Sequence, residues 1–395
     1  MKYMLKGFKT EIKVTKQQII KIHQSIGICR YLYNTYIVKN KELYELYKEG
    51  KIDKTQAFMS ANDFDKYINN EVKILDDFKW INECGSKARK KAIVNAEVAY
   101  KRFFKGQSKF PRFKKKKNQN VKIYFPKNNA TDWTIERHKI KIPTIGFVKL
   151  KEFGYIPTNA KAINGNVSMK AGKYYVSVLC DVIDRNDYSN YTNEGIGIDL
   201  GVKDLAIVSN IDKPYKNINK SKIIRQLKKK LKRIQRQVSR KYEMNKDGKK
   251  FIKTKNIIKL ESKIRHIYQQ LTNIRLNYIH NITNNLVKNK PEYIVIEDLN
   301  VKGMMKNKHL AKAVQEQCFY EFRKQLTYKC LWNNIELRIV DRFYPSSKLC
   351  SECGRIKKDL KLSDRIYVCN ECGIEIDRDK NASINLKNAK EYKIA

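Results

Sequence analysis

Residues 293–300 read YIVIEDLN, an apolar run that leads directly into two acidic residues. A short run rich in β-branched and aromatic residues predicts a buried strand over residues 293–297. A carboxylate at the end of such a strand loses hydration, and proteins tolerate this cost where the acid binds a cation. Successive side chains of a strand point to opposite faces, so Glu297 and Asp298 are not both expected at one site. We predict Glu297 as a metal ligand and Asp298 as a turn or helix-start residue.

Two further acids stand in comparable positions. Asp199 ends GIGID in the segment 195–210, GIGIDLGVKDLAIVSN, which predicts strand, turn and strand. Asp379 lies in IDRDKNASINL, where Asp377 is also placed to cap a helix. Each acid taken alone fits a strand end or a helix cap as well as a metal ligand. If Asp199, Glu297 and Asp379 converge, they can hold two divalent cations about 3.5–4 Å apart for phosphodiester hydrolysis.

Four of the nine cysteines are clustered near the C-terminus. Two CxxC pairs separated by fifteen residues have the spacing of a zinc ribbon, in which each pair supplies two thiolates to one tetrahedral ion. Four thiolates leave no open position for water, so this Zn²⁺ is expected to be structural. The other five cysteines lie in apolar or helical segments and are expected to be reduced. The predicted zinc ligands are Cys350, Cys353, Cys369 and Cys372.

The composition is strongly basic. Lys and Arg number 84 against 40 Asp and Glu, which gives a net charge of +44. Charge of this size increases repulsion within the folded state, and a polyanionic partner relieves it, so nucleic acid is expected as a partner. A membrane surface is the electrostatic alternative, but the sequence has no uncharged apolar stretch of about 18 residues. The N-terminal MKYMLKGFKTEIKV also lacks the apolar core of a signal peptide, so we expect a cytoplasmic, nucleoid-associated protein.

Two N-terminal segments are rich in basic residues, as is the outer face of the predicted helical pair at KKKLKRIQRQ. In residues 86–104, SKARKKAIVNAEVAYKRFF, a helical apolar stripe leaves cations to project away from the core, Arg89 among them. An ordinary solvated face is the alternative interpretation. Residues 109–120, KFPRFKKKKNQN, form a Pro-interrupted basic loop with two aromatic residues, suited to backbone contacts and base stacking. The residues predicted to bind nucleic acid are Lys87, Lys90, Lys91, Arg112 and Lys114.

The order of hydrophobic patterns predicts the succession of elements. Helical periodicity dominates before residue 104, and short alternating runs between residues 121 and 183 favour antiparallel strands in a small β-barrel. Later patterns predict a long helical pair with an apolar seam, broken at NKDGKK. The principal expected elements are a helix from Thr15 to about Tyr47, strands at 195–210, the helical pair around 245–250, a strand at 293–297, a helix from about Leu310 to Asn333, a strand at 336–344 and a final helix.

The ordered motifs GIDLGVKDLA, VIEDLNVKGM and SSKLCSECG...YVCNECG...DRDKNASINL resemble the TnpB family, transposon-encoded RNA-guided nucleases related to compact type V CRISPR effectors. The resemblance spans nearly the whole chain, including IGICRYLYN and KFPRFKKKK. It implies a RuvC-like, RNase H-type domain whose Asp, Glu, Asp triad corresponds to Asp199, Glu297 and Asp379, with Asp377 in reserve for the third position. It also implies a prokaryotic source, a guide RNA encoded near the transposon end, and a short DNA motif read by the N-terminal lobe.

We therefore expect a multidomain α+β protein with two lobes. A helical domain is inserted in a wedge-like β-barrel, and a zinc ribbon is inserted in a RuvC-like α/β domain. The expected boundaries are 1–14 for the first barrel strand, 15–110 for the helical recognition domain, 111–185 for the rest of the barrel, 186–345 for the RuvC-like domain with a helical hairpin at 215–290, 346–375 for the zinc ribbon and 376–395 for the final RuvC-like helix.

The expected function is RNA-guided DNA endonuclease activity. Guide RNA and double-stranded target DNA are the expected partners, with no obligate protein partner, and hydrolysis would use two Mg²⁺ ions in a single RuvC-like site. A nuclease-derived RNA-guided DNA-binding repressor is one alternative, but it would lack an acid of the triad, and all three are present. A DNA transposase, or a transposase accessory protein, is the other. The five histidines are isolated and form no His-x-His pair beside a tyrosine nucleophile.

Overall fold

The structure, a computed structural model, divides into two compact units, Met1–Asp184 and Arg185–Ala395. The end of the predicted basic loop at 109–120 lies outside the described residues. Among the helices that are described, none is both long enough and apolar enough to cross a membrane. The described residues are 3–116, 121–127, 129, 132–183, 192, 194–361 and 363–395.

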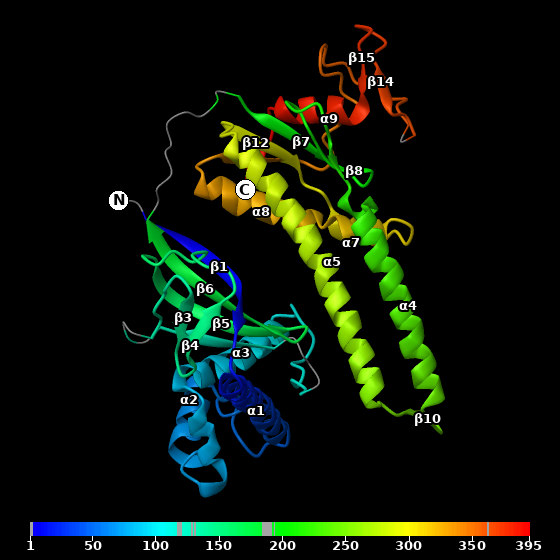
Figure 1. The fold of residues 1–395 in the computed structure, drawn as a ribbon. Coiled ribbons are helices and arrows are strands. Elements are labelled where there is room, and N and C mark those ends of the chain that lie inside the picture. Colours follow the sequence, from blue (N-terminus) through cyan, green and yellow to red (C-terminus); the bar gives the residue numbers. More distant parts are fainter. Residues whose placement is uncertain are drawn as a thin grey trace. The chain divides into compact units, whose positions relative to one another are not determined.

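The first unit contains a curled six-stranded antiparallel sheet in the order β2-β5-β6-β1-β4-β3 (Figure 1). The N-terminal strand pairs with β6 along nearly its whole length and is therefore central. The segment predicted as a small β-barrel is thus a curled sheet, in which no ladder joins β2 to β3 among the described residues. The strands are β1 (Tyr3–Lys13), β2 (Val121–Pro126), β3 (Lys139–Ile142), β4 (Gly146–Leu150), β5 (Lys161–Lys170) and β6 (Lys173–Ile183).

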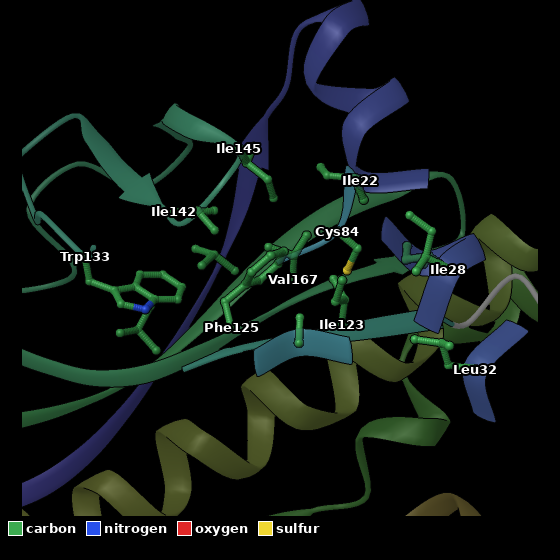
Figure 2. Close-up of a cluster of buried hydrophobic side chains, with 14 of the residues drawn as sticks. Ile22, Ile28, Leu32, Cys84, Ile123, Phe125, Trp133, Ile142, Ile145 and Val167 are labelled. Atoms are coloured by element: carbon green, nitrogen blue, oxygen red, sulfur yellow. The ribbon is translucent and has the colours of Figure 1, made fainter. Parts of the chain in front are cut away.

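The helices of this unit lie between β1 and β2 in the chain. The predicted first helix is confirmed, and it begins with a capping box in which Thr15 and Gln18 bind each other's backbone N–H groups. Ile22, Ile28 and Leu32 of this helix and Phe125 and Val167 of the sheet belong to one buried cluster (Figure 2). Helices and sheet therefore share a core. The helices are α1 (Lys16–Lys48), α2 (Ala61–Tyr67), η1 (Ile68–Val72), η2 (Asp76–Glu83) and α3 (Ser86–Phe104).

The second unit is built on a mixed sheet in the order β16-β13-β12-β7-β8-β9. β7, β8 and β9 form an antiparallel meander, and β12 and β13 continue the sheet in parallel with β7. The predicted strands around Asp199 and Glu297 are confirmed. The strands are β7 (Ile196–Leu200), β8 (Asp204–Val208), β9 (Tyr215–Lys216), β12 (Tyr293–Glu297), β13 (Glu336–Val340) and β16 (Lys393–Ile394).

The predicted helical pair is also present (Figure 1). Leu231, Ile234, Ile267 and Leu271 are buried in its seam, as the apolar periodicity predicts. Between the two helices, where the sequence predicts a break at NKDGKK, the chain forms a short β-hairpin. This part consists of η3 (Ile218–Lys220), α4 (Lys222–Met244), β10 (Lys246–Asp247), β11 (Lys250–Phe251) and α5 (Lys255–Lys288).

One continuous helix from about Leu310 to Asn333 is a wrong prediction. The structure has α6 (Val301–Met304), α7 (Ala311–Gln317) and α8 (Phe319–Trp332), and Cys318 breaks the chain between the last two with φ of 57°. The break places the Gln317 amide against the turn that follows β7, where its Nε2 donates to the carbonyls of Gly201 and Val202. A left-handed Cys has no sequence signature, because this conformation usually selects Gly or Asn.

The C-terminal segment differs from the prediction as well. β13 ends at Val340, so the strand expected over 336–344 is shorter. The final helix, α9, covers only Arg378–Lys387, and the chain then returns to the sheet, where β16 pairs antiparallel with β13. Before α9, β14 (Ile366–Val368) and β15 (Glu375–Asp377) form the hairpin of the cysteine cluster.

Candidate active site

Asp199 and Glu297 leave two adjacent parallel strands at the same end. Ile198 of β7 is aligned with Ile296 of β12, so the residues that follow are neighbours. Alternation along each strand decides the face. Ile296 packs with α8 residues in the core on one face, whereas Val295 packs with Leu386 of α9 on the other. Glu297 has the same parity as Val295 and therefore points to the α9 face.

Gly197 brings α9 close to β7. A methyl group at this position would lie 2.0 Å from the Ser383 carbonyl oxygen and 2.4 Å from the Lys387 nitrogen, so only a glycine permits this approach of the two backbones. Asp199 lies two residues further along the same face, and Asp379 lies in the first turn of α9. The glycine therefore allows the third acid to approach the first two.

Burial and mutual repulsion set the electrostatics of the three acids. Burial is the largest cause that raises the pKa of Asp199 to about 8, and the negative charges of Glu297 and Asp379 raise it further, while Arg378 opposes them. Burial also raises the pKa of Glu297, opposed by a hydrogen bond from Ser346. Oxygen ligands that repel one another suit a divalent cation, which relieves the repulsion. The donor set therefore fits Mg²⁺.

Asp377 and Asp379 have different surroundings. Asp377 Oδ1 accepts hydrogen bonds from the backbone N–H groups of Asp379 (3.0 Å) and Lys380 (3.1 Å), which is the capping geometry that the sequence permitted. Asp379 instead pairs with Arg378 at 3.0 Å through its side chain. Both acids raise the pKa of Asp199, and Asp379 does so more than Asp377. Asp379 as the third ligand stays a prediction.

Asp298 points away from this cluster. Its carboxylate accepts from Arg323 Nη1 at 2.6 Å and from Arg342 Nη2 at 2.9 Å, and the Arg323 bond is the main cause that lowers its pKa. Of the two roles predicted for Asp298, the turn is found, because Leu299 N donates to the Glu297 carbonyl on either side of it. The helix-start role belongs to Asn300, which caps α6 by accepting from Gly303 N. The two acids of YIVIEDLN thus serve opposite faces of the sheet, and Asp298 anchors two cations.

Sequence reasoning missed the side chains that surround a hollow beside Glu297. The hollow has a volume of about 240 Å³ and combines cations with an aromatic ring. Arg323 and Tyr320 come from α8, whereas Arg342 follows β13, so no local pattern connects them. In the sequence they are one tyrosine and three basic residues among many. The residues concerned are Lys302, Tyr320, Arg323 and Arg342.

The four clustered cysteines form a compact site. Their sulfur atoms all lie within 4.8 Å of one another, and the Cys350–Cys372 and Cys353–Cys369 Sγ pairs are each 3.6 Å apart. Thiolates 2.3 Å from a tetrahedral zinc ion lie about 3.8 Å apart, so the cluster can hold a metal such as zinc. Among the described residues, no other group of three or more potential metal ligands has its ligand atoms within this distance of one another. The carboxylate oxygens of the three acids are therefore more widely spaced than the cysteine sulfur atoms.

The predicted nucleic-acid-binding residues lie in the first unit. Lys91 and Lys114 line the same hollow, of about 280 Å³, together with Lys115, Lys122 and Tyr124. Lys114 lies over the ring of a tyrosine, Nζ to centroid 3.6 Å, and Lys91 lies near the Tyr124 ring at 5.8 Å. The hollow is therefore both cationic and aromatic. The remaining predicted residues are exposed and do not line it: Lys87, Lys90 and Arg112.

Arg89 corrects the predicted cationic face of α3. It is buried, and its Nη1 donates to the Ile81 carbonyl, so it contributes to the fold and cannot project outward. In the helical pattern Arg89 borders the apolar stripe of α3. Only the structure shows that η2 packs over this side of the helix and covers Arg89. The exposed cations of α3 that the prediction selected are Lys87, Lys90 and Lys91.

The approach of α9 gives a testable prediction. We expect Gly197→Ala to lower the free energy of unfolding by about 1–3 kcal/mol, because its methyl group overlaps backbone atoms of α9 that cannot move as a side chain can. Gly7→Ala in β1 is the matched control, since no atom lies within 4 Å of its added methyl group. Denaturant unfolding of both variants measures the difference. Equal stability of the two would contradict the packing described.

Comparisons with known proteins agree with this fold. The family model described as "Probable transposase" matches residues 177–308, the model "Cas12f1-like, TNB domain" matches residues 319–386, and a model "Helix-turn-helix domain" matches residues 1–49. In this structure the last of these segments consists of β1 and α1.

Relatives match nearly the full length of the chain. A Streptomyces pristinaespiralis protein described as "Putative RNA-guided DNA endonuclease" is 28% identical over 98% of this chain and 89% of its own length. The Escherichia coli K12 protein "Putative RNA-guided DNA endonuclease InsQ" is 27% identical over 97% of this chain and 91% of its own.

A solved structure shares the fold. The cryo-EM structure of a Cas12f1–sgRNA–target DNA complex aligns with a TM-score of 0.59 and 13% identity, and covers 99% of this chain and 100% of that one. The likeness extends over both units of this chain. The family models and the full-length relatives confirm the resemblance of the ordered sequence motifs to the TnpB family.

Proposed function

We propose that the protein is an RNA-guided DNA endonuclease that hydrolyses target DNA at the acids on the α9 face of the second sheet. The observation that carries this proposal is the meeting of Asp199 and Glu297 at the ends of β7 and β12, with a strongly raised Asp199 pKa. The descriptions of the two relatives as RNA-guided DNA endonucleases support the same activity.

The donor set favours two Mg²⁺ ions held by Asp199, Glu297 and Asp379. Ions at this place would supply an activated water and stabilise the leaving oxygen of the phosphodiester. The charges of Glu297 and Asp379 are the two largest that raise the pKa of Asp199, so Asp199 is the candidate to share both ions. The meander followed by two parallel strands supports a single RuvC-like site of the RNase H type.

The chain's own cations would hold the DNA strand that is cut. Arg323 and Arg342 stand beside Glu297, and Asp298 fixes both side chains without using all of their donors. Their guanidinium groups are suited to phosphates adjacent to the one being hydrolysed. By binding these phosphates, the two arginines would position the DNA strand and align the phosphate to be hydrolysed with the acids.

The first unit would bind guide RNA and the DNA motif beside the target. The hollow lined by Lys91 and Lys114 joins positive charge to the Tyr124 ring, a combination that suits a phosphate backbone with a stacked base. The guide itself would read the remaining target sequence by base pairing. No protein partner is needed in this proposal.

Sequencing of the RNA that co-purifies with the protein tests the guided part of the proposal. We expect one predominant transcript that extends from the transposon end into adjacent sequence, and it should resist competition by bulk cellular RNA. Protein purified from cells that lack the transposon-end sequence is the control. Random RNA fragments in both preparations would contradict a dedicated guide.

The raised pKa of Asp199 predicts that metal binding depends on pH. Because the carboxyl is largely protonated below its pKa of about 8, a cation must displace the proton there, and the apparent affinity falls by up to about tenfold per pH unit below 8. Above pH 8 the affinity should level off. In the metal-free protein, stability should fall as the pH rises from the ordinary aspartate range to about 8, since ionisation occurs later in the folded state than in the unfolded state.

Calorimetric Mn²⁺ titrations between pH 6 and 9 measure this dependence. Asp199→Asn is the blank, because it removes the titrating carboxyl and a proposed ligand of the cation while it keeps the size of the side chain. An affinity that is the same at pH 6 and pH 8 in the wild type would show that Asp199 does not compete with a proton for the cation.

A further inference from the structure

The loop that enters the zinc ribbon contacts one of the proposed metal ligands. Ser346 is 4% exposed, and its hydroxyl donates to Glu297 Oε1 at 2.5 Å. This bond occupies one carboxylate oxygen and leaves Oε2 available to a cation. We infer that Ser346 is a positioning residue for Glu297, an inference that rests on the proposed function. Two asparagines of α9 bind the loop that leads into the zinc ribbon and thereby hold Ser346 in place.

Asn385 holds the turn that contains Ser346. Its Nδ2 donates to the Ser346 carbonyl at 2.8 Å and to the Leu349 carbonyl at 2.6 Å, and the side chain is 2% exposed. The Pro345 carbonyl accepts from two later N–H groups of the same turn. Both ends of the turn are therefore fixed to one helical residue, which restricts the position of the serine hydroxyl.

Asn381 holds the backbone on both sides of a zinc thiolate. Its Nδ2 donates to the Leu349 carbonyl at 2.7 Å, and its Oδ1 accepts from Ser351 N at 3.0 Å, so the two contacts flank Cys350. Asn381 is fully buried. Asn381 and Asn385 are four residues apart and lie on the same face of α9. The first cysteine pair and the Ser346 turn are thus attached to the same helix.

The same helix carries Asp379 and rests on β7 at Gly197. A continuous series of contacts therefore runs from Cys350 through Asn381 and Asn385 to Ser346 and Glu297. Buried polar side chains are kept where all their bonds are satisfied, and such networks fix one arrangement. If α9 only attached the ribbon to the sheet, the two asparagine contacts would be enough, and no hydrogen bond from Ser346 to Glu297 would be required. The serine bond gives the structural zinc a route to the geometry of the acids.

Residues that orient metal ligands in this way typically contribute 10- to 100-fold to metal affinity or activity. We therefore expect Ser346→Ala to weaken Mn²⁺ binding at the acids by about 10- to 100-fold, and to raise the Mg²⁺ concentration for half-maximal cleavage by a similar factor. Ser346→Thr keeps the hydroxyl and should restore most of both. Zinc content and thermal unfolding should change little, because the asparagine contacts use the Ser346 backbone.

Ser351→Ala is the matched control. It also removes a hydroxyl from the first cysteine pair, but that hydroxyl is buried and has no hydrogen-bond partner among the described residues, whereas the backbone N–H that Asn381 binds remains. The full-length protein is used throughout. Mn²⁺ binding is measured by calorimetry as the difference between each variant and Asp199→Asn, zinc by release to a colorimetric chelator, and cleavage with the bound guide.

Equal Mn²⁺ affinity in Ser346→Ala and wild type would overturn the inference. Loss of zinc in Ser346→Ala but not in Ser351→Ala would also overturn it, because the serine would then act on the ribbon and not on Glu297. Failure of the wild type to cut guided DNA would instead overturn the proposed function, and the comparison of Mn²⁺ affinities would still decide the role of Ser346.

Discussion

Asp199→Ala is expected to abolish DNA cleavage and to leave guide RNA and target binding intact. Burial is the largest cause that raises the pKa of this side chain, and the negative charges of Glu297, Asp379 and Asp377 all act on it. Its removal would take away the oxygen ligands best placed to share two cations. We expect cleavage to slow by at least about 10³-fold, which corresponds to about 4 kcal/mol of transition-state stabilisation.

The assay compares single-turnover cleavage with gel-shift binding of the same guided complex. Binding should survive, because the cationic surfaces of the first unit and the arginines beside Glu297 are unchanged. Asp377→Asn is the matched control: it removes a nearby charge but keeps an oxygen that can cap α9. Undiminished cutting by Asp199→Ala would remove this residue from the site, and loss in Asp377→Asn alone would move the third ligand to Asp377.

Cys350→Ser is expected to remove zinc, to unfold the ribbon and to stop cleavage. Structural zinc sites bind with apparent free energies of about 10–16 kcal/mol, and this energy contributes to folding. The effect should reach the acids, because Asn381 binds the backbone on both sides of Cys350. Loss of a ribbon ligand would then lower activity although no ribbon residue touches the substrate phosphodiester in our proposal.

Zinc release and thermal unfolding measure this effect. Cys318→Ser is the control, because Cys318 is a half-buried free cysteine outside the cluster, and its sulfur donates to carbonyls that a serine hydroxyl can also reach. If the wild-type protein contained no zinc and unfolded at the same temperature as Cys350→Ser, the cluster would not hold a structural metal.

Much of the second unit follows from local patterns in the sequence. Short apolar runs predict β7 and β12, and the alternation of side chains along a strand is enough to separate Glu297 from Asp298. The spacing of four cysteines predicts their cluster, because two CxxC pairs have few other uses in a reduced protein. These features depend on residues near one another in the chain or on ligands with a recognised spacing.

Features that depend on distant contacts were missed. Arg323 and Arg342 lie 25 and 44 residues beyond Asp298, and nothing in the sequence distinguishes them from other cations. The degree to which the curled sheet approaches a barrel depends on whether β2 and β3 meet, which alternation within each strand does not decide. Ser346 looked like a residue of the cysteine motif, and only its hydroxyl contact with Glu297 gives it a second role.

Cleavage with a replaced guide tests the central claim most directly. The wild-type protein, loaded with its own RNA scaffold and a new guide segment, is incubated in Mg²⁺ with a plasmid library that carries the matching target beside a randomised motif. We predict that only plasmids with the matching target are cut, that one short motif is enriched among them, and that Asp199→Ala cuts none. Plasmids left uncut by the wild type, or cut without regard to the guide, would contradict this account.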